Sequence, residues 1–292
     1  LIGGCVENGK GVNFPGIGID MPPLTDQDCM DLSLAIDEGA DWIALSFVRS
    51  AKDKAAVDSI LKDKKVSIPV IAKIEKWEAL EQLDKIIDTF DGVMVARGDL
   101  GVEIPQEQVP LIQKKIISMA NKSGKPVIIA TQLLETMIES PTPTRAEISD
   151  IANAIFDGTD ALLVTGETAI GKFPQKVIEV LKRVIIETEN TIDFNNILQP
   201  IGHEHHTADA ISHATCQIAN DMNIGVILSL THSGSTARMI ARYKPSADII
   251  ALTPVEKTYR QLSIIWGVTP NKIKEYSNSD DIPTVSAKFI ND

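Results

Sequence analysis

A chain of 292 residues, 43% of them apolar and 23% charged, can bury one large domain and a smaller second one. Its formal net charge of -12 argues against a nucleic-acid partner, because phosphate backbones are bound by clustered Lys and Arg, which this sequence does not concentrate. No apolar run is as long as a membrane span, no secretory signal is recognisable, and the three cysteines form no CxxC pair, so we expect a cytoplasmic protein with no membrane partner.

The first part of the chain alternates apolar runs with segments of helical spacing. Five runs rich in Val, Ile, Leu and Ala predict buried parallel strands. They cover residues 42–47, 70–74, 92–96, 126–130 and 161–164. Thr144 with Glu147 has the pattern of a capping box that opens a helix, and Gly158 closes that helix. Thr25 with Asp28 predicts another helix start.

Alternating strands and helices predict a parallel sheet with helical crossovers, either an open doubly wound sheet or a closed barrel. Charged and hydroxyl residues follow the strands, which favours the barrel, because barrel enzymes keep their chemistry at that rim. These residues are Arg49, Lys73, Glu75, Arg97, Asp99, Thr131, Gln132, Thr165 and Glu167. Five strands do not close a barrel of eight, so three further strands are expected outside this chain.

A polar stretch at 195–206, which contains Pro200 and Gly202, predicts a linker. A second pattern follows it. Helices at 208–221, from Ser235 onward and up to Trp266, with strands at 226–230 and 249–252, predict a compact α/β unit.

Lys73 and Glu75 lie two residues apart at the end of a predicted strand, so their side chains project to one side, and Asp99 follows the next strand. Two carboxylates on neighbouring strand ends suit a hard cation such as Mg²⁺ or Mn²⁺. Lys73 can neutralise a phosphoryl group or an enolate oxygen. The competing interpretation is an ion pair or solvated strand-end charges, which is the commoner outcome for any single carboxylate, and spacing alone does not decide between them.

Three further segments give weaker signals. Glycines in the segment 97–101 place backbone N–H groups where an anion can bind, although such glycines more often serve only the turn. Thr131 and Thr165 place hydroxyls at the rim, although most strand-end threonines are structural. The loop 231–236 is a candidate phosphate site, and an ordinary capped turn is an equally good interpretation. Its residues are Thr231, His232, Ser233, Gly234, Ser235 and Thr236.

Seven segments together resemble the pyruvate kinase family over essentially the whole chain. They are KGVNFPG at 10–16, SFVR at 46–49, AKIEK at 72–76, MVARGDLGVEIP at 94–105, GKPVIIATQLLETM at 124–137, PTPTRAEISDIANAIFDGTDA at 141–161 and TGETAIGKFP at 165–174. A run of MVARGDLG followed at this distance by ATQ and TRAE is highly specific. The resemblance implies a (β/α)8 TIM-type barrel, of which the C-terminal five strands are present, followed by a smaller α/β C-terminal domain.

The resemblance also implies a metal-dependent phosphoryl transfer from phosphoenolpyruvate to ADP, which gives pyruvate and ATP in glycolysis. In the family, the lysine matching Lys73 stabilises the transferring phosphoryl group and the enolate, and the residues matching Glu75 and Asp99 hold Mg²⁺ or Mn²⁺. Backbone donors matching Gly98 and Asp99, with the Thr131 hydroxyl, bind the substrate carboxylate. Thr131 and Thr165 resemble parts of a relay that brings a proton to the enolate.

Family members also carry an N-terminal part that supplies K⁺ ligands, the first barrel strands and an inserted lid domain. The resemblance therefore divides the chain into the last stretch of the lid at 1–12, a partial barrel at 13–195, a linker at 196–207 and an incomplete C-terminal regulatory domain at 208–292. We expect this piece by itself to be catalytically impaired. The family also implies a homotetramer, and many members bind a sugar-phosphate effector at a loop that 231–236 resembles.

Two other functions stay open at the level of sequence. One is a metal-dependent carbon-carbon lyase on a related barrel that binds pyruvate. It would use the same metal ion and carboxylate ligands, but it leaves the TRAE and TGET segments and the second domain without a role. The other is a non-catalytic fragment that keeps only effector binding and subunit assembly.

Overall fold

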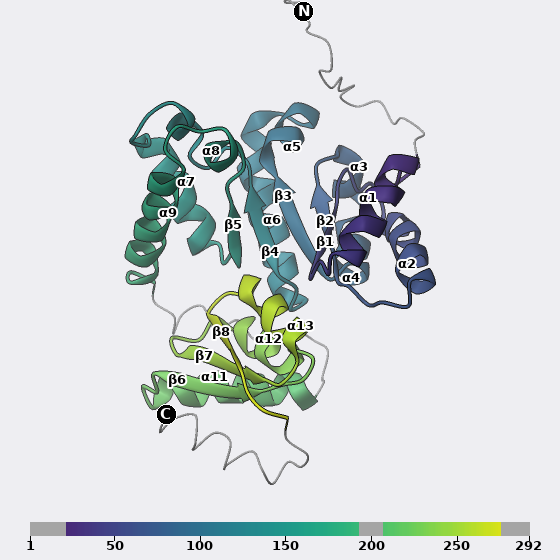
Figure 1. Cartoon of the computed structure of the whole chain (residues 1–292). Coiled ribbons are helices and arrows are strands. Elements are labelled where there is room, and N and C mark those ends of the chain that lie inside the picture. Colours follow the sequence, from purple (N-terminus) through teal and green to yellow (C-terminus); the bar gives the residue numbers. More distant parts are fainter. Residues whose placement is uncertain (1–21, 193–206, 276–292) are drawn as a thin grey trace, which may run out of the picture.

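The computed structural model describes residues 22–192 and 207–275. They form two successive α/β units, a larger one with a five-stranded sheet and a smaller one with a three-stranded sheet (Figure 1). The predicted end of the lid at 1–12 and nearly all of the predicted linker lie outside the described residues. Neither described range contains a helix long and apolar enough to cross a bilayer.

The larger sheet consists of five parallel strands in sequence order, each hydrogen-bonded to the next. The strands are β1 (Ile43–Leu45), β2 (Val70–Ile74), β3 (Gly92–Ala96), β4 (Val127–Ala130) and β5 (Ala161–Leu163). All five predicted strands are confirmed, and β2 and β3 have the predicted bounds. Helices connect the strands, and this repeated strand and helix order is that of the predicted barrel, with β1 and β5 as the edges among the described strands.

Helices cover one face of this sheet and bury the main core between helix and sheet. The helices of this unit are α1 (Asp26–Asp37), α2 (Lys54–Asp63), α3 (Trp77–Glu81), α4 (Leu83–Thr89), α5 (Arg97–Glu103), α6 (Val109–Lys122), α7 (Arg145–Phe156), α8 (Gly166–Ala169) and α9 (Pro174–Glu189), of which α8 contributes no residue to this core. Because side chains alternate along a strand, Ala72 and Ile74 belong to this core, while Ile71 joins a smaller group on the other face. Lys73 lies between Ala72 and Ile74 on the same strand, so its side chain projects from the opposite face, which is that of Ile71.

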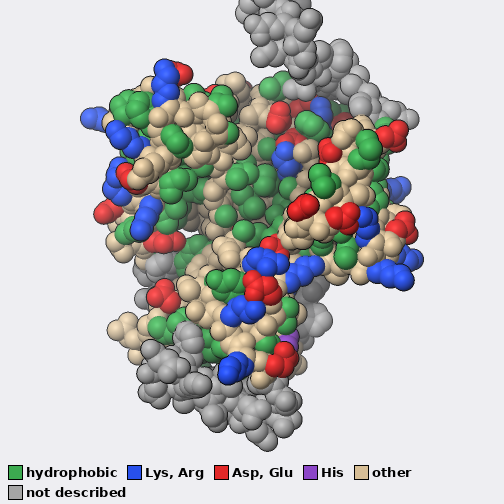
Figure 2. All heavy atoms as spheres, viewed as in Figure 1, with side chains coloured by type: hydrophobic (Ala, Val, Ile, Leu, Met, Phe, Trp, Pro, Cys, Tyr) green, Lys and Arg blue, Asp and Glu red, His purple; other side chains and the backbone are tan. Residues whose placement is uncertain are grey.

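The face of the sheet that carries Lys73 is hollowed. Figure 2 shows hydrophobic side chains gathered in this hollow, above the smaller unit. The buried group there consists of Ile71 from β2, Met94 from β3, and Ile128 and Ala130 from β4. The polar residues at the strand ends therefore border an apolar floor, where charges are screened less by water than on an open surface.

Two helix starts follow the capping chemistry that the sequence predicts. The Thr25 side chain accepts a hydrogen bond from the Asp28 N–H, and Asp28 accepts one from the Thr25 N–H at 2.8 Å. The same reciprocal pair joins Thr144 and Glu147 at the start of α7. Each pair satisfies N–H groups that a helix start leaves without an intrahelical partner.

The smaller unit has three parallel strands in the order β6–β7–β8. Its elements are α11 (Thr207–Asp221), β6 (Val226–Leu230), α12 (Ser235–Ala241), β7 (Asp248–Thr253), α13 (Glu256–Gln261) and β8 (Val268–Lys272). The prediction of a helix through Trp266 is wrong, since helical structure ends with a 3-10 turn at Ile264. Gly267 adopts a φ of 66°, which reverses the chain into β8.

The two units meet at the amino-terminal ends of the barrel strands. Arg260 binds Asp41, just before β1, at 2.8 Å, and the Trp42 indole donates to the Gln261 carbonyl at 3.2 Å. Lys244 binds Asp160, just before β5, at 3.0 Å. The strand ends that carry the candidate site lie at the opposite end of the sheet, so the smaller unit does not cover them.

Candidate active site

Lys73 and Glu75 meet at the carboxyl end of β2. The Lys73 Nζ lies 2.8 Å from the Glu75 Oε1 and donates to the Ser46 Oγ at 2.9 Å. The Glu75 side chain is 1% exposed and that of Lys73 is 25% exposed. Burial of a carboxylate is tolerated here because a cation and hydrogen bonds compensate for the lost water. The predicted convergence of these two side chains is therefore present in the structure.

The second oxygen of Glu75 is held by the backbone. The Phe47 N–H donates to the Glu75 Oε2 at 2.6 Å, and Phe47 has a φ of 54°. A left-handed conformation is costly for a bulky residue, and the short bond to a buried carboxylate compensates for part of that cost. Sequence reasoning missed Ser46 and Phe47 as partners, because neither a single serine hydroxyl nor a positive φ at Phe leaves a recognisable pattern.

Asp99 lies in the first turn of α5, which follows β3 directly, and β3 is the hydrogen-bonded neighbour of β2. Its carboxylate makes no hydrogen bond or ion pair to any residue of the described ranges that the structure records. The strand order brings Asp99 to the same end of the sheet as Glu75. No group of three or more His, Cys, Asp or Glu side chains in the described residues can hold a metal by itself.

This donor set fits Mg²⁺ or Mn²⁺ rather than a soft metal. Glu75 and Asp99 supply hard carboxylate oxygens, and a cation of this kind keeps several ligands from water and substrate, so a pair of carboxylates is sufficient. Zn²⁺ prefers a closed set of thiolate and imidazole ligands, and no such set exists among the described residues. Glu75 and Asp99 are the residues that would hold the ion.

Gly98 and Thr131 contact one another across two neighbouring strands. The Gly98 N–H donates to the Thr131 Oγ1 at 2.8 Å, and the Thr131 hydroxyl donates to the Ala130 carbonyl at 2.6 Å. A Cβ at position 98 would lie 3.4 Å from that hydroxyl, so the glycine allows a close approach. The structure thus brings the Gly98 N–H and the Thr131 hydroxyl, both predicted to bind the substrate carboxylate, together, and they are hydrogen-bonded to each other.

Arg97 fixes the backbone that presents Thr131. Its guanidinium donates to the Thr131 carbonyl at 3.0 Å and to the Gln132 carbonyl at 2.9 Å, and it pairs with Asp150 on α7. Thr131 and Gln132 have φ values of 67° and 54°, two left-handed residues in succession. Arg97 is buried and supplies the planar donors that this turn requires. The sequence identifies Arg97 only as one charge at the rim.

Thr165 follows β5 but contacts neither Thr131 nor Lys73 through a recorded hydrogen bond. Its N–H donates to Glu167 at 2.9 Å, and the other oxygen of Glu167 accepts from the Leu134 N–H at 3.1 Å. Glu167 is buried and therefore clamps the turn after β5 to the segment after β4. The structure places Thr165 one strand away from Thr131 and leaves its predicted role as a prediction.

The loop 231–236 joins β6 to α12 and uses many of its polar groups internally. The Thr231 Oγ1 accepts from the Gly234 N–H at 2.8 Å, Ser233 and Ser235 hydroxyls lie 3.1 Å apart, and the His232 carbonyl accepts from Thr258 at 2.6 Å. Gly234 has a φ of 78° at the helix start. These contacts are those of an ordered turn with internal hydrogen bonds, and effector binding there stays a prediction.

Comparisons with known proteins agree with this architecture. The family described as "Pyruvate kinase, barrel domain" matches residues 1–178, and "Pyruvate kinase, alpha/beta domain" matches residues 209–291. Pyruvate kinase 2 of Synechocystis sp. is 45% identical over 99% of this chain and 48% of its own length. The pyruvate kinase of Sporosarcina psychrophila is 45% identical over 96% of this chain and 48% of its own length.

A solved structure shows the same fold. A crystal structure of a pyruvate kinase from Cryptosporidium parvum superposes with a TM-score of 0.92 at 37% identity, over 96% of this chain and 59% of the other. The chain spans about half the length of the curated relatives it matches.

Fold and site together define a (β/α)-barrel protein with a lysine and carboxylates at the carboxyl ends of its strands, followed by a second α/β domain. The two family matches fall on these two domains in the same order. The chain belongs to the pyruvate kinase family.

Proposed function

We propose that the protein transfers the phosphoryl group of phosphoenolpyruvate to ADP, giving pyruvate and ATP in glycolysis. The observation that carries the proposal is the contact between Lys73 and Glu75 at 2.8 Å on the inner face of the barrel sheet, beside the strand that leads to Asp99. Phosphoryl transfer depends on positioning and charge neutralisation, and the Lys73 ammonium paired with Glu75, with Asp99 after the neighbouring strand, supplies fixed charges for it. The family matches support the proposal.

Each residue of the site has a task in this reaction. Lys73 neutralises negative charge on the transferring phosphoryl group and on the enolate that remains. Glu75 orients the Lys73 ammonium, and its own position is fixed by the Phe47 N–H. Thr131 and the backbone of Gly98 and Asp99 bind the substrate carboxylate, for which Gly98 exchanges its present hydrogen bond to Thr131. Thr131 and Thr165 pass a proton toward the enolate carbon.

Glu75 and Asp99 hold Mg²⁺ or Mn²⁺, which when bound supplies positive charge to the oxygens of the substrate. Manganese binding tests this assignment without any activity assay, through the relaxation of water protons. Glu75→Gln and Asp99→Asn are each expected to weaken Mn²⁺ binding at least about tenfold. Glu107→Gln, an exposed acidic residue outside the site, serves as the control. Equal Mn²⁺ affinity in all variants would show that the ion binds elsewhere.

Pyruvate formation by the whole protein that depends on both phosphoenolpyruvate and ADP tests the activity. Lys73→Met is expected to lower kcat about a hundredfold to a thousandfold, because a charge that acts in the transition state is lost. Lys182→Met, an exposed lysine on α9, is the matched control. If pyruvate is released without any requirement for ADP, the result favours the lyase alternative. If the protein folds without Mn²⁺ and binds a sugar phosphate but shows no turnover, the result favours a non-catalytic module.

The proposal includes a setting for the reaction. The protein acts in the cytoplasm as a homotetramer that requires K⁺, with no membrane or nucleic-acid partner, and no residue of this chain is assigned to the K⁺ ion. The loop 231–236 binds a sugar-phosphate effector, for which the hydroxyls of Ser233 and Ser235 on an ordered turn are the support. Gel filtration with light scattering measures the oligomer, and a titration with and without Ser235→Ala measures effector binding.

A further inference from the structure

A large cleft lies between the two domains, at the end of the barrel sheet opposite the candidate active site. Its volume is about 650 Å³. Five cationic side chains line it: Lys54, Lys62, Lys125, Arg238 and Lys257. Asp58 and Asp91 are the acidic residues among its lining, so the cleft carries a net positive charge within a protein whose formal charge is -12. A local concentration of cations against the overall sign attracts small anions.

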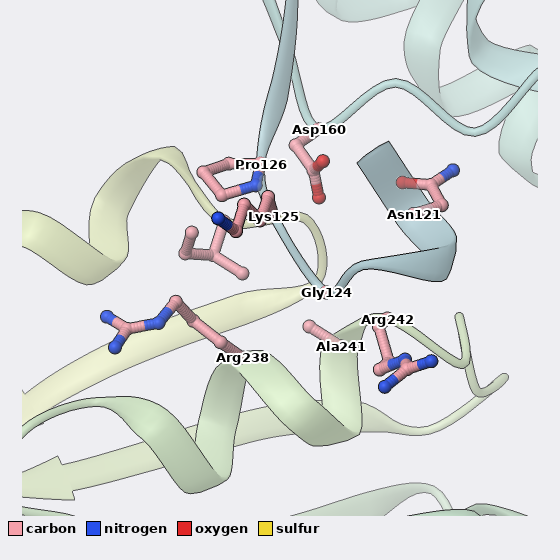
Figure 3. A pocket seen from close by; sticks show the side chains of 9 residues that line it. Asn121, Gly124, Lys125, Pro126, Asp160, Arg238, Ala241 and Arg242 are labelled. Atoms are coloured by element: carbon pink, nitrogen blue, oxygen red, sulfur yellow. The ribbon is translucent and has the colours of Figure 1, made fainter. Parts of the chain in front are cut away.

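The cations that line the cleft come from both domains. Lys54 and Lys125 belong to the barrel, and Arg238 and Lys257 belong to α12 and α13 of the smaller domain. Lys125 and Arg238 also line a narrower pocket that continues the cleft (Figure 3). Figure 3 shows Lys125 beside Pro126 on the barrel side and Arg238 on the helix of the facing domain. An anion between them would contact both domains.

Arg238 differs from its neighbour one helical turn later. Arg242 binds Asp209 at 2.8 Å and donates to the Lys122 carbonyl at 2.7 Å, so its guanidinium is satisfied. Arg238 makes no recorded hydrogen bond or ion pair with any residue of the described ranges. Burial lowers the pKa of its guanidinium, and the negative charge of Asp91 raises it by a smaller amount. A guanidinium that loses water and gains no partner is unfavourable unless an anion completes its surroundings.

The other groups of the cleft suit a phosphorylated molecule rather than a bare ion. Ser67, Ser123 and Thr258 place hydroxyls along the lining, and Trp42 and Leu61 provide an apolar wall for a carbon skeleton. Lys125 donates to the backbone carbonyl of Phe90 at 2.6 Å, and Lys54 lies 3.5 Å from Asp91, so both ammonium groups are already oriented toward the same end of the cleft.

We propose that this interdomain cleft is a binding site for a small phosphorylated metabolite, with its phosphoryl group held between Arg238 and Lys125. The cleft adjoins the loop 231–236, whose Ser233 is part of its lining, but its two charged anchors, Arg238 and Lys125, lie outside that loop. A ligand there joins the two domains and therefore stabilises their present arrangement.

Pyrophosphate is the probe for this site, with binding measured by calorimetry and by the fluorescence of Trp42. Arg238→Gln is expected to weaken binding at least about tenfold, since a charge-assisted contact is lost, and to abolish the rise in Tm that pyrophosphate gives. Because Arg238 has no recorded protein partner, the substitution leaves the Tm without ligand unchanged or higher. Lys182→Gln on α9 removes the same charge from an exposed position and keeps wild-type binding.

Two further variants test whether pyrophosphate binds in this cleft or at the loop 231–236. Trp42→Phe is expected to remove the fluorescence change while leaving the heat of binding, because Trp42 lines the cleft. Ser235→Ala, in the loop 231–236, is expected to bind pyrophosphate as the wild type does. Binding that survives Arg238→Gln but is lost in Ser235→Ala belongs to the loop and overturns the proposal, as does an absence of any pyrophosphate binding at millimolar concentration.

Discussion

Thr131 and Gln132 adopt left-handed backbone conformations in succession, which non-glycine residues rarely do. Such strain persists only where the surroundings fix it, and here the Arg97 guanidinium binds both carbonyl groups. The strained turn aims the Thr131 hydroxyl at Gly98. At the scale of single residues, the site therefore depends on a side chain that touches no substrate in the proposed reaction and acts by positioning.

Arg97→Lys tests this positioning role. Lysine keeps the positive charge but lacks the planar fork that reaches two carbonyl groups, so the turn at Thr131 and Gln132 is expected to relax. We expect kcat/KM for phosphoenolpyruvate to fall about tenfold to a hundredfold, mainly through KM, while the Tm changes little. A fall in kcat/KM together with a large loss of Tm would instead show that Arg97 serves the fold.

Cys216 gives a second prediction at this scale. Burial raises the pKa of its thiol to about 12, from an ordinary value near 9. Since the folded pKa lies above the unfolded one, the protonated thiol stabilises the fold fully below about pH 9, and this contribution is lost as the pH rises toward 12. The thiol of the native protein is therefore expected to resist alkylation at pH 8, while the partly exposed Cys29 reacts.

Peptide mapping after alkylation distinguishes the two cysteines. For the stability effect, the unfolding free energy is measured in urea at several alkaline pH values. Cys216→Ala is expected to lose less stability than the wild type as the pH rises, because the titrating thiol is gone. Equal pH slopes in the two proteins would contradict the assignment.

At the scale of elements, helix starts and buried strands were predictable and their ends were not. Gly92–Ala96 is a continuous apolar run buried on both faces, and Val70–Ile74 departs from such a run only at Lys73, so composition defines both strands. By contrast, β8 contains Pro270, which is unfavourable inside a sheet and is tolerated here because β8 is an edge strand among those described. The helix expected through Trp266 ends early because Gly267 requires a left-handed conformation.

In the candidate site too, some contacts were predictable from the sequence and others were not. The pairing of Lys73 with Glu75 follows from alternation along one strand, which is local information. The contacts of Ser46, Phe47 and Arg97 join segments that are distant in sequence, and no local pattern encodes them.

Thr144 at the start of α7 provides the prediction at this scale. Its side chain accepts from the Glu147 N–H, and Glu147 in turn accepts from Thr136 and Thr144. Burial alone would raise the pKa of Glu147, but these hydrogen bonds outweigh it and lower the pKa. Thr144→Ala is expected to cost about 1 kcal/mol of unfolding free energy in urea. Thr142→Ala, an exposed control, is expected to change it by less than about 0.5 kcal/mol, and equal losses would exclude the cap.

At the scale of the whole molecule, a buried ion pair joins the two domains. The Lys244 Nζ lies 3.0 Å from the Asp160 Oδ1, with side chains only 6% and 7% exposed. Asp160 also accepts from the N–H groups of Val127 at 2.9 Å and Trp266 at 3.3 Å, and the ammonium lies 4.8 Å from the Trp266 ring. Burial lowers the pKa of Lys244 although Asp160 acts to raise it. This cluster fixes the orientation in which the interdomain cleft exists.

Lys244→Met is expected to destabilise the protein by about 3 to 5 kcal/mol, because Asp160 then keeps a buried charge without its cation. Adding Asp160→Asn should recover part of that loss, since the charge is removed while the hydrogen bonds from Val127 and Trp266 can remain. Lys64→Met breaks a pair that is 34% and 60% exposed, and we expect a cost below about 1 kcal/mol. Calorimetry should show the two domains unfolding separately in Lys244→Met. A single transition as stable as that of the wild type would mean that the apolar contacts, and not this pair, hold the domains together.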